Sequence, residues 1–169
     1  MAEKNLIVDG LEINYSGLFD LQGLLKTIDD MTASRGYRKA EKRRAEEVTE
    51  TGKEFSIELR PSKVKQAEVA LSMKIRISVK NLQTVDVTID NLPAKLDTGD
   101  VNVIIDGWEV TDWESRWEQT AWYMFFRNLY DRFIKKFVGK YEGEVIDDTH
   151  FVYNNIKAHL ELHKYKVKS

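Results

Sequence analysis

Apolar and polar residues alternate along four stretches in the middle of this 169-residue chain. Because successive side chains of a strand point to opposite faces, each stretch would form a strand with one apolar face and one polar face. Such strands are typical of an antiparallel sheet that covers a core with one face and meets water with the other. The apolar positions are Phe55, Ile57 and Leu59, then Val69, Leu71, Met73, Ile75, Ile77 and Val79, then Val85, Val87 and Ile89, and finally Val101, Val103 and Ile105.

Other segments carry helix and turn signals around this sheet. We predict one α+β domain over residues 1–169, an antiparallel sheet of five to seven strands with three helices, most of them packed on its apolar face. The remaining predicted boundaries are a strand over residues 6–15, a helix that Ser16 caps and that ends near Gly36, turns at residues 91–93 and 97–100, and a last helix from Asp147 or Asp148 to Tyr165.

Residues 38–50 fit two different structures. They are rich in Ala, Glu, Lys and Arg, which favour a helix, but they offer no apolar stripe that would dock such a helix on the core. As a solvated strand, they would extend the sheet by pairing with residues 55–59 through a turn at residues 50–53. We favour the strand and leave the helix open.

The third predicted helix runs from Thr111 to Tyr141 and contains three of the four tryptophans. Thr111 and Glu114 form a capping box, in which each side chain satisfies a free backbone N–H of the first turn. The apolar side of this helix changes partway along, so that it faces two surfaces rather than one. One side carries Trp113, Trp117, Ala121 and Met124, and the opposite side carries Trp122, Phe126, Leu129, Phe133 and Phe137.

This change of face suggests that the tryptophans meet something besides the core. Tryptophan and arginine concentrate at the centres of protein interfaces, and exposed aromatic patches are avoided in monomers. We therefore expect a non-enzymatic interaction or scaffold protein that forms a homodimer. Packing in an ordinary core, or the binding of a small apolar molecule between helix and sheet, would also use these side chains. The candidate partner- or ligand-binding residues are Trp108, Trp113, Arg116, Trp117 and Trp122.

Basic residues provide a second candidate surface. A basic sheet face can hold RNA phosphates, which makes an RNA- or ribosome-associated factor the other alternative. Acidic residues such as Glu46, Glu47 and Glu58 lie close by in the sequence, so a solvated face is the simpler interpretation. The candidate nucleic-acid-binding residues are Lys42, Arg43, Arg44, Lys74 and Arg76.

Composition argues against several other classes of protein. The net charge is −2, which gives no general attraction to nucleic acid, and the absence of cysteine excludes disulfides and thiolate metal sites. No apolar run approaches the ~20 residues that span a bilayer. The start of the chain, Met1-Ala2-Glu3-Lys4, lacks the order of a signal peptide. We expect a cytoplasmic protein without a cofactor.

Motifs for catalysis or metal binding have simpler structural interpretations. Asp97-Thr98-Gly99 matches the aspartic-protease triplet but lacks the apolar strand before it, which favours a turn. His159 and His163 share one helical face without the rest of a zinc motif. The acidic group Asp106, Glu109, Asp112, Glu114 and Glu118 fits the start of a helix. We predict no catalytic residue and no metal site, and we lean against an enzyme.

Scattered single residues resemble a pattern in small uncharacterised archaeal proteins. The resemblance covers residues 36–165 and implies an archaeal source and a shared α+β fold, with no activity attached. A sheet that grips a long helix is also similar to the helix-grip domains that bind lipids and polyketides, although another helix follows in this chain. The residues of the pattern are Gly99-Asp100-Val101, Gly107, Trp117-Glu118, Phe126-Arg127, Leu129-Tyr130-Asp131, Phe133-Ile134 and Tyr141-Glu142.

Overall fold

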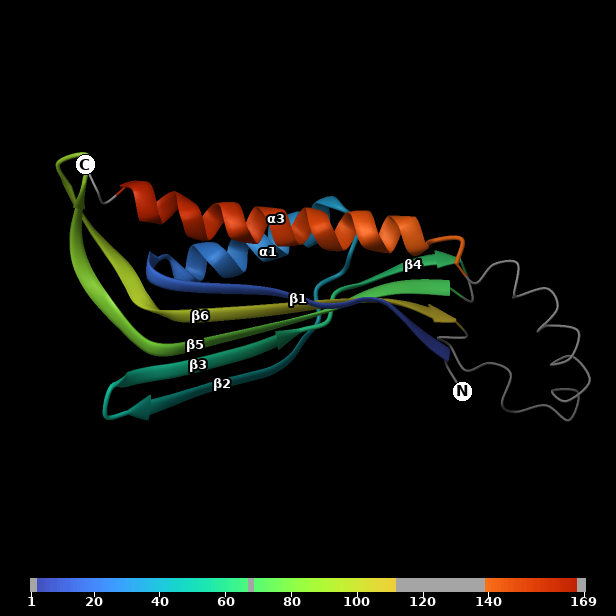
Figure 1. Cartoon of the computed structure of the whole chain (residues 1–169), viewed down its shortest axis with the longest axis horizontal. Coiled ribbons are helices and arrows are strands. Elements are labelled where there is room, and N and C mark those ends of the chain that lie inside the picture. The colour runs from blue at the N-terminus through green and yellow to red at the C-terminus, as the bar shows by residue number, and fades with distance from the viewer. Residues whose placement is uncertain (1–2, 67–68, 112–138, 167–169) are drawn as a thin grey trace, which may run out of the picture.

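The computed structural model describes residues 3–66, 69–111 and 139–166 of the chain. These residues form an α+β structure (Figure 1) in which two helices accompany six strands. The third predicted helix falls mainly on residues 112–138, which lie outside the described residues. In chain order the elements are β1 (Glu3–Phe19), α1 (Leu21–Ser34), β2 (Glu41–Thr49), β3 (Gly52–Leu59), β4 (Ser62–Gln66), β5 (Val69–Ile89), β6 (Leu92–Thr111) and α3 (Glu142–Lys166).

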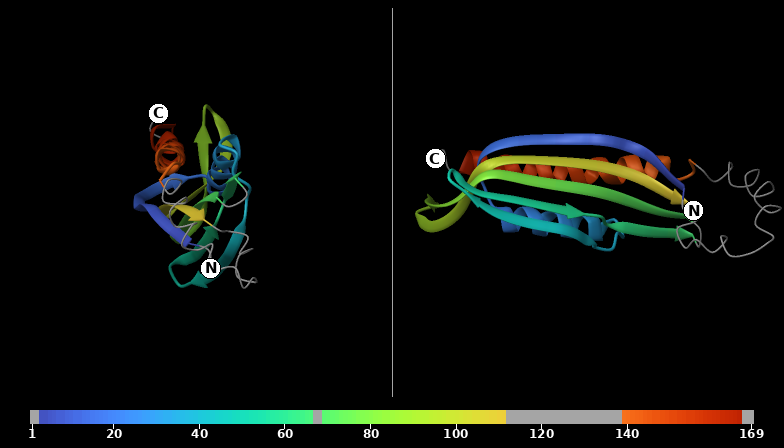
Figure 2. Two further views of the ribbon diagram at one scale, coloured as in Figure 1. Left: turned by 90° about the vertical axis from the view of Figure 1, so that its right-hand side faces the viewer. Right: turned by 90° about the horizontal axis from the view of Figure 1, so that it is seen from below.

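The strands form one antiparallel sheet in the order β1-β6-β5-β3-β2, which confirms the predicted sheet. β4 follows β3 along the same side of β5, and pairs with the part of β5 that β3 does not reach. Both helices lie on one face of the sheet (Figure 1). The opposite face, which we call the distal face, is turned to the viewer in the right-hand panel of Figure 2.

The predicted apolar positions build the core between the sheet and the two helices. All six alternating residues from Val69 to Val79 are buried, as are Val101, Val103 and Ile105 of β6. On α1, an aspartate N-cap at Asp20 starts the helix, and its buried stripe includes Leu24 and Ile28. On α3, the buried positions recur every three or four residues, as one helical face requires. They are Val145, Asp148, Thr149, Val152, Ile156 and Leu160.

Gly107 sets how closely α3 approaches the sheet. A Cβ atom at this position would lie 2.7 Å from Thr149 Oγ1 and 2.8 Å from Val145 Cγ1. Side chains do not tolerate such contacts, so only glycine allows the first turns of α3 to rest directly on β6.

Residues 41–49 form strand β2, which confirms the strand interpretation of residues 38–50. β2 pairs with β3 through a turn after Thr49, within the predicted turn region. The described side chains of β2 are largely exposed. Pairing with β3 satisfies the backbone N–H and C=O groups of this polar segment. A helix would satisfy them as well but would not dock on the core, so the pairing outweighs the helical propensity of the segment.

Two helix boundaries differ from the prediction. Ser16 does not cap α1, because β1 continues to Phe19 and the hydroxyl of Ser16 donates to Asp100 across the sheet. Asp20 takes the cap position, where its carboxylate accepts the N–H of Gly23. α3 begins at Glu142 rather than near Asp147. The first helical turn shows no apolar stripe in the sequence, but Val145 packs on Gly107 and stabilises this turn.

The predicted turn at Asp97-Thr98-Gly99-Asp100 is wrong. These residues lie within β6, and the two predicted strands that end at Val79 and Ile89 are one continuous strand, β5. The chain reverses at Asp90 and Asn91, whose φ angles of 51° and 64° are those of a type I′ hairpin turn. A bulge follows Lys80, opposite residues 98–100, and the long hairpin curves there (Figure 1). The turn-forming residues therefore mark a bend in the strand.

Candidate interaction site

Apolar side chains gather on the distal face at one end of the sheet. We call Leu6, Val64, Trp108 and Val110 the apolar patch. Leu6 is 44% exposed and Val64 56%, whereas Trp108 and Val110 are half-buried. The patch spans two adjacent cross-strand rows, which are Leu6, Trp108, Ser72 and Ser62, and Lys4, Val110, Ala70 and Val64.

The patch is local, because the distal face is polar further along the same strands. A neighbouring part of that face carries the row Asn14, Asn102, Ser78 and Ser56. The side-chain amide of Asn102 donates to Glu12 and to Asn14 within this region. An ordinary solvated sheet face would carry such polar rows along its whole length, so the patch is the exception that calls for a partner.

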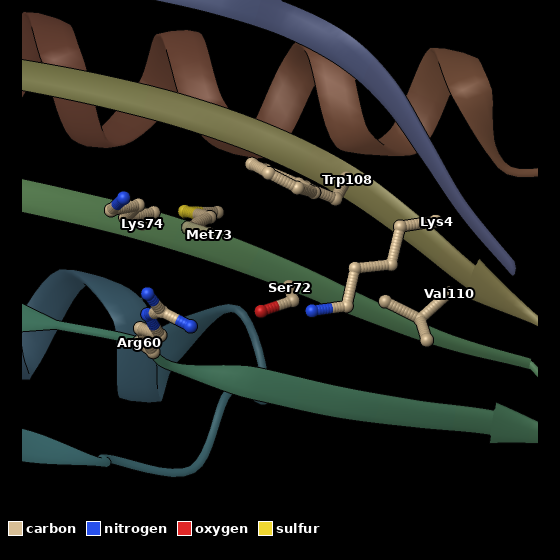
Figure 3. A pocket seen from close by; sticks show the side chains of 7 residues that line it. All are labelled: Lys4, Arg60, Ser72, Met73, Lys74, Trp108 and Val110. Atoms are coloured by element: carbon tan, nitrogen blue, oxygen red, sulfur yellow. The ribbon is translucent and has the colours of Figure 1, made fainter. Parts of the chain in front are cut away.

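A pocket of about 70 Å³ opens beside the patch. Figure 3 shows its lining, with Lys4 and Arg60 pointing towards each other from opposite sides of Ser72. The ammonium of Lys4 lies 5.9 Å from the centre of the Trp108 ring. The indole N–H of Trp108 is covered by its surroundings and has no hydrogen-bond acceptor among the described residues. The lining residues are Lys4, Arg60, Ser72, Met73, Lys74, Trp108 and Val110.

The structure places one of the five predicted interaction residues, Trp108, in this site. Trp113, Arg116, Trp117 and Trp122 lie outside the described residues. The described chain stops at Thr111 and starts again at Gly139, whose N–H donates to the carboxylate of Glu109 at 3.2 Å. Both ends of the tryptophan-rich segment 112–138 are therefore attached at the end of the sheet that carries the apolar patch.

The predicted basic residues do not share one surface. Arg43, Lys74 and Arg76 lie on the distal face, where acidic side chains separate them. Arg76 forms an ion pair with Asp106 at 3.1 Å, and Arg76 and Lys74 both face Glu58. Arg44 lies on the opposite face, over the ring of Phe55. Lys42 belongs to β2, but its side chain is outside the described part of the structure.

Two members of the predicted acidic group are buried on opposite faces of β6. Asp106 faces the distal side, where it accepts hydrogen bonds from Arg76 and from the backbone N–H of Gly10. Glu109 faces α3 and is 1% exposed. Its Oε2 accepts the N–H of Gly139, while its Oε1 is buried without a hydrogen-bond partner in the described part of the chain. The two carboxylates cannot act as a catalytic pair, and the other three members lie outside the described residues.

Burial raises the pKa of Glu109 above its ordinary value of 4.5, and the nearby carboxylate of Glu142 raises this pKa further. Because the folded chain binds the proton of Glu109 more tightly than the unfolded chain, ionisation of Glu109 destabilises the fold. The contribution to stability is complete below about pH 4.5 and is lost as the pH rises through the folded-state pKa.

Replacing Glu109 by glutamine should therefore change the pH dependence of stability. Glutamine keeps an oxygen for the N–H of Gly139 but does not ionise. We expect the free energy of unfolding of the Glu109→Gln variant, relative to wild type, to rise as the pH increases from about 4.5 upwards. Denaturant unfolding at a series of pH values measures this difference. A difference in the free energy of unfolding that stays constant over that pH range would contradict a raised pKa of Glu109.

A buried ionic cluster attaches α3 to the edge of the sheet. The ammonium of Lys63 in β4 contacts Asp148 at 2.8 Å and Glu144 at 2.7 Å. Tyr37 donates its hydroxyl to Asp148 at 3.1 Å, and Arg35 pairs with the other oxygen of Asp148. Burial, together with the charge of Asp148, raises the pKa of Tyr37. No sequence pattern pointed to this cluster, because its members come from three separate segments.

Burial alone would lower the pKa of Lys63, but its hydrogen bonds to Asp148 and Glu144 outweigh this effect and raise the pKa. The cluster thus holds a charged lysine between two carboxylates at neutral pH. Each of its polar groups has a partner, which fits an anchor for α3 rather than a reactive site.

The two remaining sequence motifs take part in packing. Asp97 accepts hydrogen bonds from the backbone N–H of Leu21 and from Thr84, so it ties β6 to the start of α1. His159 lies between the helices, where its ring nitrogens contact Thr27 and the carbonyl of Asp20. The side chain of His163 is not described. Across the described ranges, no group of three or more His, Asp or Glu residues could hold a metal ion.

The sequence matches no protein-family model, and no curated protein or solved structure is significantly similar to it. Neither α1 nor α3, the two helices in the described part of the chain, could cross a lipid bilayer.

Proposed function

We propose that this chain is a non-enzymatic interaction protein that forms a homodimer through the end of the sheet that carries the apolar patch. The observation that carries the proposal is the exposure of Leu6 and Val64 beside Trp108 on a face that is mostly polar elsewhere. The tryptophan-rich segment 112–138, which is attached at the same end, would supply the remaining apolar contacts.

Burial of this patch would provide the driving force for association. Removing apolar surface from water contributes roughly 25 cal/mol per Å², and a tryptophan at the centre of an interface often dominates its binding energy. In a two-fold symmetric dimer, each residue of the patch is used twice, once from each protomer. A few exposed apolar side chains can therefore have a large combined effect.

The proposal is tested by removing exposed side chains that the fold does not need. We expect the double variant Leu6→Ser/Val64→Ser to weaken dimerisation by at least about tenfold, because each change removes apolar contacts from both protomers. Sedimentation velocity over a range of concentrations measures the dissociation constant. Trp113→Ser/Trp117→Ser should act in the same direction while the sheet stays folded.

Val48→Ser provides a matched control, because Val48 is 76% exposed on β2, away from the patch. This change should leave the dissociation constant unaltered. A wild-type protein that stays monomeric at all concentrations would refute the proposal. So would an equal loss of dimer in the Val48→Ser variant.

The two alternative functions remain predictions. An apolar-ligand site needs a cavity beneath the helix predicted for residues 111–141, most of which is not described. A hollow of about 400 Å³ on the distal face is lined mostly by polar residues, which do not suit such a ligand. RNA binding is favoured by the position of Lys74 near Trp108, but Glu58 and Asp106 interrupt the basic surface. The polar hollow is lined chiefly by Asn14, Ser16, Ser78, Lys80, Asp100 and Asn102.

A further inference from the structure

The pocket beside Trp108 brings three cationic side chains together, those of Lys4, Arg60 and Lys74. Lys4 and Lys74 both line it, and no carboxylate of the described chain forms an ion pair with either. The guanidinium of Arg60 engages Glu58 through Nε at 2.6 Å. Glu58, which also faces Lys74, offsets one of these three charges. The remaining cationic charge around a small hollow raises the local positive potential, which an anion would relieve.

A neutral donor in the same pocket, the hydroxyl of Ser72, adds to this positive potential. The hydroxyl of Ser72 reaches the carbonyl of Pro61 only at 3.5 Å, the long limit of a hydrogen bond. The indole N–H of Trp108 has no acceptor among the described residues, but its surroundings cover it, so it can report on the pocket from beside it rather than bind in it.

The pocket lies mainly on adjacent, paired strands, and only Arg60 of its cationic residues comes from the link between β3 and β4. Lys4 comes from β1, Trp108 from β6, and Ser72 and Lys74 from β5, and the register of these three strands fixes their spacing. Figure 3 shows Lys4 and Arg60 approaching Ser72 from either side, with Trp108 on the neighbouring strand. A site built on strands holds its donors in place before a ligand arrives, which lowers the entropy lost on binding.

We propose that this pocket binds a phosphate group, either as the free ion or as a small phosphate ester. Lysine and arginine together match a doubly charged anion with several acceptor oxygens better than they match a single carboxylate. The volume of about 70 Å³ admits one such group and leaves the rest of an ester outside, over the apolar patch. This inference goes beyond the proposed function and does not depend on dimerisation.

Nuclear magnetic resonance can test the proposal at the residue itself. Inorganic phosphate is titrated into the ¹⁵N-labelled full chain at constant ionic strength, with chloride as the balancing ion. The indole N–H signal of Trp108, identified by its loss in Trp108→Phe, should shift and saturate. Glycerol 3-phosphate, titrated in parallel, distinguishes the free ion from a phosphate ester. The compound that binds more tightly indicates which of these two classes of ligand the pocket prefers.

Charge-removing variants decide whether the pocket itself binds phosphate. Lys4→Gln should weaken phosphate binding about tenfold, the loss expected for one charge-assisted hydrogen bond. Lys80→Gln removes a charge from an exposed lysine elsewhere on β5 and should leave the affinity unchanged. No saturable shift, equal weakening by both variants, or equal affinity for acetate would overturn the proposal.

The dimer and the phosphate site can fail separately. The Leu6→Ser/Val64→Ser variant keeps all seven lining residues of the pocket. If it loses the dimer but retains the phosphate-dependent shift of Trp108, both proposals hold. If the wild type is a monomer and still binds phosphate, only the proposed homodimer is wrong.

Discussion

Replacing Ile75 by alanine should lower the free energy of unfolding by about 2–5 kcal/mol. Ile75 is fully buried in the middle of β5, between neighbours on β3 and β6. The change removes apolar contacts and leaves a cavity that close-packed strands cannot easily fill. Chemical denaturation, monitored by circular dichroism, measures the effect.

Lys74 provides the control for this prediction, because it is the sequence neighbour of Ile75 and faces the distal side. Lys74→Ala should change the free energy of unfolding by no more than about 0.5 kcal/mol. Equal losses at the two positions would show that the sheet is covered on both faces. The arrangement of one buried face and one distal face would then be wrong.

Replacing Asp148 by alanine should destabilise the fold by about 3–5 kcal/mol. Asp148 is the centre of the buried cluster, with Lys63, Tyr37 and Arg35 around it. Its removal takes the acceptor Asp148 from the hydroxyl of Tyr37 and leaves the ammonium of Lys63 with Glu144 and the carbonyl of Arg35. We expect a lower unfolding midpoint and faster hydrogen exchange in the first turns of α3.

Asp147→Ala is the matched control, because Asp147 precedes Asp148 on α3 but is exposed. It should change stability by no more than about 0.5 kcal/mol. A similar loss for both variants would mean that the effect comes from helix propensity or net charge. The ionic cluster would then not be the anchor of α3.

The sequence patterns that gave correct predictions were those in which the burial of one face of a strand or helix decides whether that element is stable. Alternation from Val69 to Val79 required a strand with one buried face, and the structure buries all of these apolar positions. The polar segment 38–50 was assigned to a strand because no apolar stripe could dock it as a helix. The alternation also restricts the pairing register of such a strand, because a slip of one residue would turn all of its apolar side chains to the solvent face.

The predictions that were wrong concern positions where a distant partner outweighs a local signal. Ser16 has the chemistry of a helix cap, but pairing with β6 keeps it in β1. Asp97-Thr98-Gly99-Asp100 has the chemistry of a turn, yet hydrogen bonding to β5 on one side and β1 on the other holds it extended. These ladders join residues far apart in the chain, and a local pattern carries no information about them.

The sequence by itself determined the antiparallel sheet and its apolar face, and it named Trp108 as a candidate interaction residue. Only the tertiary structure decided what surrounds Trp108. The pairing of β1, β6 and β5 brings Lys4, Ser72 and Trp108 to one pocket, and that of β4 adds Val64 to the apolar patch. The tertiary structure also placed Lys63 against Asp148. The physical reason is that strand order and register, which depend on the whole sheet, fix which side chains become neighbours across the strands.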